Sequence, residues 1–245
     1  ARIFENLNLL NFLDMRNNLL AVIPSDTFQS LNVLSLLQLS NNRLTSILPA
    51  WFRNLANLSI VNLNVNLITE VLPDTFVGTT RIGLINLNTN RISIIHDGAF
   101  RTLTNLQTLD LSNNLITSLN ANFFAGFPNI NDLRLNFNQI EEFPDGLFSP
   151  FQTIRFFEAR GNRLRVVSRK YFGNLGILDF LRFDDNLIVA FDQRIMDEAR
   201  MLRTFTFFGN ICATGSLTSN PPVNLTPCFA NYVAMGRLKV NFFNM

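Results

Sequence analysis

Residues 106–124 read LQTLDLSNNLITSLNANFF, and their apolar residues follow neither the alternation of a strand nor the 3.6-residue period of a helix. Leu109 and Leu111 precede the asparagine Asn114, and Phe124 follows it ten residues later. The same arrangement recurs at a fixed step of 24 residues in both directions. A period of this size indicates a stacked array of short structural units.

An asparagine marks the period along almost the whole chain. It occurs nine times in succession, at Asn18, Asn42, Asn66, Asn90, Asn114, Asn138, Asn162, Asn186 and Asn210. Apolar residues stand five and three positions before each of these asparagines. A phenylalanine stands ten positions after the first seven, at Phe28, Phe52, Phe76, Phe100, Phe124, Phe148 and Phe172, and Met196 takes its place in the eighth.

Elementary physical chemistry explains these residue types. A short L-x-L segment alternates inward and outward as a strand does, so each turn of chain contributes one strand at roughly 4.8 Å from the next. One turn cannot bury its leucines and phenylalanine alone, so stability is a sum over neighbouring turns. The asparagine amide is donor and acceptor at once and can bridge backbone groups of adjacent turns. Leaving such groups unpaired costs on the order of 1–3 kcal/mol each.

The pattern L-x-x-L-x-L-x-x-N-x-L resembles the leucine-rich repeat, in the 24-residue form found in Toll-type receptor ectodomains and secreted arthropod repeat proteins. The resemblance implies an α/β solenoid curved into a horseshoe, with a parallel β-sheet on the concave face and irregular or short helical segments on the convex face. It divides the chain into the second half of a repeat at 1–9, nine repeats at 10–211, and a C-terminal cap with a tail at 212–245. We expect an N-terminal cap over the first, incomplete repeat.

The two cysteines, Cys212 and Cys228, lie just after the last asparagine of the series. Leucine-rich arrays commonly end in a cysteine cap, so the resemblance implies a disulfide between them. Two free thiols in a cytosolic protein are the alternative. The tripeptides starting at Asn57 and Asn224 have the Asn-x-Ser/Thr form of glycosylation acceptors. These features predict a secreted or extracellular protein, with the ectodomain of a membrane protein as the alternative.

Composition excludes several classes of protein. The net charge of +2 is too balanced to predict nucleic-acid binding. No stretch approaches the ~20 apolar residues of a membrane span. His96 is the only histidine, and no phosphate-binding loop or nucleophile elbow is present. We therefore expect no enzyme activity, no cofactor and no metal site.

The outward positions of the strands are the candidate binding surface. Asparagine and serine dominate their first half, and charged and aromatic residues dominate the second half. The candidate partner-binding residues are Arg134, Phe156, Glu158, Arg160, Phe180, Arg182 and Asp184. Arginine with exposed phenylalanine is typical of an interface centre. Alternatively, the signs of Asp110, Arg134, Glu158 and Arg182 alternate on adjacent strands, so these groups can simply pair with one another.

Two further stretches depart from the repeat. Basic residues gather at Arg155, Arg160, Arg163, Arg165, Arg169 and Lys170, either as an anion-binding edge or as a flank offset by nearby acids. Ile195, Met196, Ala199 and Leu202 have helical spacing and predict a short helix.

The sequence predicts an extracellular recognition module that binds a macromolecule through the concave face, in an innate-immune or receptor-like role. A protein partner, in a hetero- or homo-oligomer, is favoured over a glycan or a lipid. The alternative function is a structural or adhesive extracellular matrix protein that assembles with itself.

Overall fold

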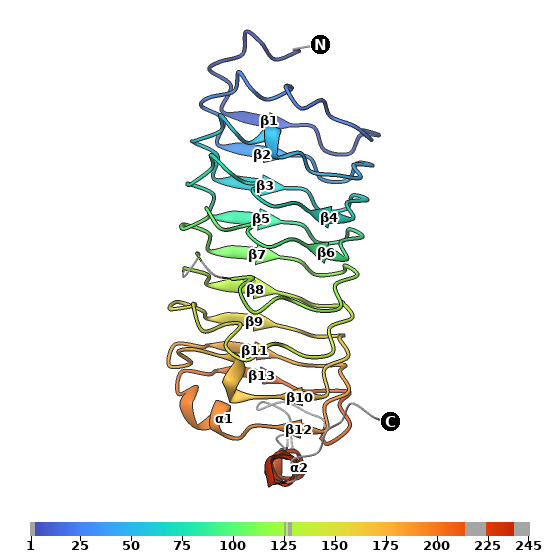
Figure 1. Ribbon diagram of the computed structural model, residues 1–245, viewed down its shortest axis with the longest axis vertical. Coiled ribbons are helices and arrows are strands. Elements are labelled where there is room, and N and C mark those ends of the chain that lie inside the picture. The colour runs from blue at the N-terminus through green and yellow to red at the C-terminus, as the bar shows by residue number, and fades with distance from the viewer. Residues whose placement is uncertain (1–2, 125, 127–128, 214–223, 238–245) are drawn as a thin grey trace.

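A nine-stranded parallel sheet runs the length of the protein, as the computed structural model in Figure 1 shows. The structure describes residues 3–124, 126, 129–213 and 224–237. The strands stack in chain order and are β1 (Phe12–Asp14), β2 (Leu36–Gln38), β3 (Ile60–Asn62), β5 (Leu84–Asn86), β7 (Thr108–Asp110), β8 (Asp132–Arg134), β9 (Phe156–Glu158), β11 (Phe180–Arg182) and β13 (Thr204–Thr206).

The register of this sheet equals the sequence period. Every pair of neighbouring strands joins residues 24 positions apart, such as Leu109 of β7 with Leu133 of β8. The middle residue of each strand points inward and is buried, while its two neighbours point outward. The predicted solenoid is therefore confirmed, and the bending of the stack into a horseshoe stays a prediction.

The remaining described elements are short and lie outside the main sheet (Figure 1). Two small parallel pairs form further along the turns, β4 (Glu70–Val71) with β6 (Ile94–Ile95) and β10 (Val166–Val167) with β12 (Ala190–Phe191). Two 3₁₀ turns cover Pro49–Trp51 and Arg169–Tyr171. The predicted short helix is α1 (Arg194–Glu198), and α2 (Thr226–Arg237) lies at the end of the stack opposite the N-terminus.

A column of phenylalanines fills the core on the side away from the sheet. All seven phenylalanines of the period are buried. The rings of Phe52 and Phe76 lie 5.0 Å apart, those of Phe76 and Phe100 5.5 Å, and those of Phe148 and Phe172 5.4 Å. Aromatic contacts at such distances add to the hydrophobic gain from burial. The column holds the non-strand side of each turn against the next.

The asparagine series closes each turn against the preceding one. The Nδ2 group of Asn114 donates to the carbonyl oxygens of Leu87, one turn back, and of Leu111, both at 3.0 Å. Its Oδ1 atom accepts the backbone N–H of Ile92 at 2.9 Å. Asn42, Asn66, Asn90, Asn138, Asn162, Asn186 and Asn210 repeat this geometry. Asn18, which follows β1, is exposed. Its side chain forms hydrogen bonds within its own turn, to the carbonyl oxygens of Met15 and Arg16, and none to another turn among the described residues.

The residue before each asparagine of the series has a left-handed backbone. These residues are Asn17, Asn41, Val65, Thr89, Asn113, Phe137, Gly161, Asp185 and Gly209, with φ between 53° and 67°. Glycine and asparagine tolerate this conformation, whereas a branched or bulky side chain is strained in it. Val65 and Phe137 therefore occupy unfavourable positions that the surrounding hydrogen bonds impose.

Replacing Asn114 by alanine should lower the free energy of unfolding by roughly 3 kcal/mol, because the change leaves several buried backbone groups unpaired. Asn18→Ala is the matched control and should cost less than about 1 kcal/mol, since water already reaches its partners. Urea unfolding of both variants measures the difference. Equal losses would show that the bonds between turns contribute nothing beyond those within a turn.

Val65→Asn should raise the free energy of unfolding by roughly 1 kcal/mol, because asparagine relieves the left-handed strain at an exposed position. The reciprocal change, Asn113→Val, should lower it by a similar amount. Thermal and urea unfolding give both values. A destabilised Val65→Asn variant would contradict the assignment of strain to this position.

Candidate recognition surface

The outward side chains of the nine-stranded sheet, with those of the residue pair after each strand, form a surface that we call the sheet face. Its first half carries mainly uncharged side chains and begins with an ion pair between Arg16 and Asp14. Ser40 Oγ lies 2.6 Å from Asn64 Oδ1, and Asn88 Nδ2 donates to Asp110 Oδ2 at 3.1 Å. These two bonds run between turns and fix the side chains, and Asp110 is the one carboxylate of this half that forms no ion pair with a described residue.

The second half of the sheet face is a network of arginines between carboxylates. Arg134 forms a bidentate pair with Asp132 of its own strand, at 3.0 and 2.6 Å, and its Nε lies 3.7 Å from Glu158 Oε1. Arg182 reaches Glu158 and Asp184, each at 3.2 Å. Burial raises the pKa of the Asp132 carboxyl, and the hydrogen bond from Arg134 offsets part of that effect. The carboxylates lie beneath, and the guanidinium groups are the more exposed members.

The sign-alternating ladder therefore forms only in part. The predicted contacts of Glu158 with Arg134 and with Arg182 are present. Arg134 makes its closest ion pair with Asp132, and Asp110 instead accepts hydrogen bonds from Asn88 and from the backbone N–H of Ser112. Asp110 is the register partner of Arg134 across the sheet, but its carboxylate is already engaged by these hydrogen bonds, which leaves Asp132 as the closest acceptor for the guanidinium group.

Phe156 and Phe180 lie beside each other on β9 and β11, with ring centroids 6.3 Å apart. Both are half-buried, which corrects the expectation of exposed rings: each is flanked by neighbouring strands. The guanidinium carbon of Arg182 lies 5.4 Å from the centre of the Phe180 ring, and that of Arg155 lies 5.7 Å from that of Phe156. Stacking of this kind restricts both partners.

Phe137 is a more exposed aromatic residue, and it is not among the partner-binding residues predicted from the sequence. It is 44% exposed, and Arg160 lies over its ring at 5.2 Å while Arg160 Nε bonds Asp185 Oδ2 at 2.8 Å. Gly161 leaves the space for this ring, since a Cβ there would lie 2.5 Å from Phe137 Cδ1. The sequence contains a signal for this exposed ring, because Phe137 is followed one repeat later, at the equivalent position, by Gly161.

The basic stretch around Arg160 is neutralised in part. Arg155 pairs with Asp179, Arg169 with Glu198, and Lys170 with Asp145. Arg163 and Arg165 are exposed and form no ion pair with a described residue, so the acids offset this stretch only in part and both expectations for it stay predictions.

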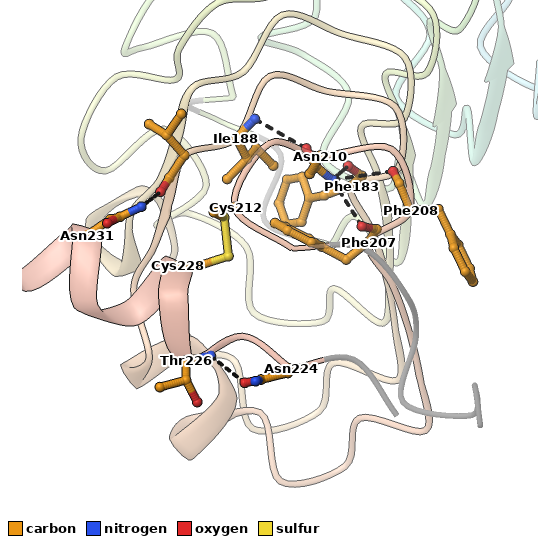
Figure 2. The surroundings of a disulfide bond; sticks show 11 residues. Phe183, Ile188, Phe207, Phe208, Asn210, Cys212, Asn224, Thr226, Cys228 and Asn231 are labelled. Carbon is orange, nitrogen blue, oxygen red and sulfur yellow. Dashed lines mark hydrogen bonds between the residues drawn. A yellow bond between two sulfur atoms is a disulfide. The ribbon is translucent and has the colours of Figure 1, made fainter. Parts of the chain in front are cut away.

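The C-terminal cap is closed by a disulfide between Cys212 and Cys228, as predicted (Figure 2). Cys228 belongs to α2, which places Asn231 so that its Nδ2 donates to the carbonyl oxygen of Val189 at 2.7 Å. Tyr232 of the same helix lies 3.1 Å from Ser168 Oγ. The cap therefore covers the last turns around β12. Of the expected tail, residues 238–245 lie outside the described residues.

The two glycosylation candidates differ in their surroundings. Asn57 is half-buried: its Nδ2 donates to the carbonyl oxygen of Asn32 at 3.0 Å, and its Oδ1 accepts from Arg81 at 2.7 Å. Asn224 is exposed at the start of α2, where its Oδ1 accepts the N–H of Thr226 at 3.0 Å (Figure 2).

His96 lies away from the sheet face, next to β6, with Nε2 2.9 Å from Glu70 Oε2. In the described part of the chain, no group of three or more histidine, cysteine or acidic residues is placed to hold a metal ion. None of the described helices is long and apolar enough to cross a membrane.

Comparison with known proteins identifies similar chains. A family model described as "Leucine rich repeat" matches residues 33–92 and 81–140. No curated protein sequence matches the chain. A solved complex of TLR13 with ssRNA13 is 25% identical, with a TM-score of 0.72, over 83% of this chain and 30% of that one.

Two more distant structures share the fold. The Drosophila Toll–Spatzle complex is 21% identical, with a TM-score of 0.56, over 84% of this chain and 34% of that one. A leucine-rich-repeat protein of Leptospira interrogans is 22% identical, with a TM-score of 0.64, over 84% and 57%. The chain thus spans less than two thirds of each of the three. Since TLR13 is in complex with RNA, the exclusion of nucleic acid from net charge is not supported.

In a eukaryotic secretory host, we expect glycan on Asn224 and little on Asn57, because both the Nδ2 and the Oδ1 atoms of Asn57 are hydrogen-bonded within the protein. Peptide mass mapping with and without glycosidase measures the occupancy of each site. Thr226→Ala removes the acceptor motif and is the control. Equal occupancy of Asn57 would contradict the structural argument.

Proposed function

Because this chain belongs to the leucine-rich-repeat family, we propose that it is an extracellular recognition module whose sheet face binds a protein partner. The candidate contact residues are Arg134, Phe156, Glu158, Arg160, Phe180, Arg182 and Asp184. The proposed role is recognition rather than catalysis, since the only histidine pairs with Glu70 away from this surface.

The observation that carries the proposal is the preorganisation of Arg182. Its guanidinium group is held by Glu158 and Asp184 and stacks on Phe180. An arginine already fixed in place loses little side-chain entropy when a partner binds. Arginine is among the residue types that are enriched at the hot spots of protein interfaces.

The extracellular, receptor-like part of the proposal has separate support. A disulfide closes the cap, and disulfides persist in oxidising compartments. The solved Toll–Spatzle complex, whose title places it in Drosophila development and innate immunity, is a leucine-rich-repeat relative in fold. An innate-immune role for this chain is an inference from that relative.

One observation favours the alternative, a structural or adhesive protein that assembles with itself. The arginines at the centre of the sheet face, Arg134, Arg160 and Arg182, each have an acidic partner within the chain. A self-neutralised surface needs no external partner. In that case the contacts between copies would lie on other surfaces.

The test begins with purification of the protein from its natural source under non-reducing conditions, which identifies the bound protein by mass. Phe180→Ala and Arg182→Glu should then each weaken binding of that protein by roughly 30-fold or more, the effect typical of an interface centre. Arg53→Glu, an exposed arginine away from the sheet face, is the control and should leave affinity within about twofold.

Unchanged affinity in both sheet-face variants would overturn the assignment of the contact residues. Recovery of a homo-oligomer whose assembly is insensitive to the two changes would favour the structural alternative.

A further inference from the structure

A second surface runs along the edge of the stack, where each strand turn ends. It consists of the residue that follows each asparagine of the series, and we call it the asparagine edge. Its members are Leu19, Arg43, Leu67, Arg91, Leu115, Gln139, Arg163, Leu187 and Ile211. From Arg43 onward, the backbone N–H of each member donates to a carbonyl oxygen of the preceding turn, so the row has a fixed spacing.

Four of the five apolar members of this row are exposed, and the fifth, Leu67, is half-buried. Leu19 is 72% exposed, Leu115 44%, Leu187 47% and Ile211 64%. Exposed apolar residues that line up along one surface, rather than being scattered, indicate an interaction site.

The charge of the asparagine edge has one sign. Arg43, Arg91 and Arg163 are exposed, and no acidic residue belongs to the row. The structure shows none of the three in an ion pair with a described residue, in contrast to Arg134 and Arg182 of the sheet face. Two acids lie two positions from members of the row: Asp185 pairs with Arg160, and Glu141 is exposed beside Gln139, so the arginines still outnumber the nearby acids. The edge is therefore apolar and positively charged, and complements an anionic surface.

We propose that the asparagine edge lies on an anionic lipid bilayer, with its arginines at the headgroup phosphates and its leucines in the outer boundary of the acyl chains. Amphipathic helices that combine arginine with leucine or phenylalanine bind in this way without crossing the membrane, and the asparagine edge presents the same two kinds of side chain. The sheet face, which is a different surface of each turn, stays free for a protein.

The spacing of the row favours a bilayer over a protein. Leu115 and Leu187 are three turns apart, about 14 Å at the usual strand separation, with Gln139 and Arg163 between them. The core of a protein interface is packed as densely as a protein interior, and side chains at this separation do not form such a core. A bilayer boundary accepts each apolar side chain separately.

Two other occupants fit less well. A second copy placed edge to edge would bring two rows of arginines together, which is repulsive. A soluble polyanion would meet arginines separated by two or three turns and would gain nothing from the leucines between them.

The test is flotation of the full chain with vesicles of 30 mol% phosphatidylglycerol in phosphatidylcholine, compared with pure phosphatidylcholine vesicles. The protein should float with the anionic vesicles only. The combined variant R43Q/R91Q/R163Q should bind on the order of 100-fold more weakly, since each arginine near an anionic surface contributes about a factor of five. L19Q/L115Q/L187Q keeps all charges and should also lose binding.

R53Q/R81Q/R200Q removes the same charge elsewhere and is the control, which should float like the unaltered protein. Circular dichroism and thermal unfolding verify that each variant is folded. Equal flotation with both kinds of vesicle, or equal loss in the control, would overturn the proposal. Capture of the protein by heparin, unaffected by the leucine changes and without flotation, would instead assign the edge to soluble polyanions and also overturn it.

Discussion

The buried asparagine amide is the interaction on which the rest of the structure depends. Each turn leaves its strand at the same point because one side chain bonds four backbone groups, two of them in the preceding turn, as Asn114 does with Leu87, Ile92, Leu111 and Ser112. Because these bonds repeat every 24 residues, they fix both the register of the sheet and the left-handed residue before each asparagine. Strain at Val65 and Phe137 is tolerated because these bonds over-determine the local backbone.

A fixed repeat turns sequence positions into surface rows. Two such surfaces, the sheet face and the asparagine edge, differ in whether their arginines have acidic partners. On the sheet face, arginines are held between acids and against phenylalanine rings, so specificity would come from geometry rather than from net charge. On the asparagine edge, three arginines lie among apolar residues, four of which are exposed, and no acid belongs to the row. The two surfaces thus suit different kinds of partner.

The sequence predicted the features that depend on the period: the strands, the asparagine bonds between turns, the phenylalanine column and the disulfide-closed cap. It did not predict features that depend on local side-chain geometry. Arg134 pairs with Asp132 on its own strand rather than with Asp110 across the sheet. Phe156 and Phe180 are half-buried because neighbouring strands flank them, and Phe137 is displayed because the residue one turn later is a glycine. The period predicts on which face of the solenoid a residue lies, whereas the solvent exposure of its side chain also depends on the side chains of the adjacent turns.

Hydroxyl-radical footprinting of the protein bound to its natural protein partner tests the central claim, that recognition takes place on the second half of the sheet face. The method reports the solvent exposure of individual aromatic side chains. On binding, we expect reduced oxidation of Phe156 and Phe180, with no change at Phe12, which lies on β1 at the other end of the sheet and is 51% exposed. Protection of Phe12 with unchanged oxidation of Phe156 and Phe180 would contradict it.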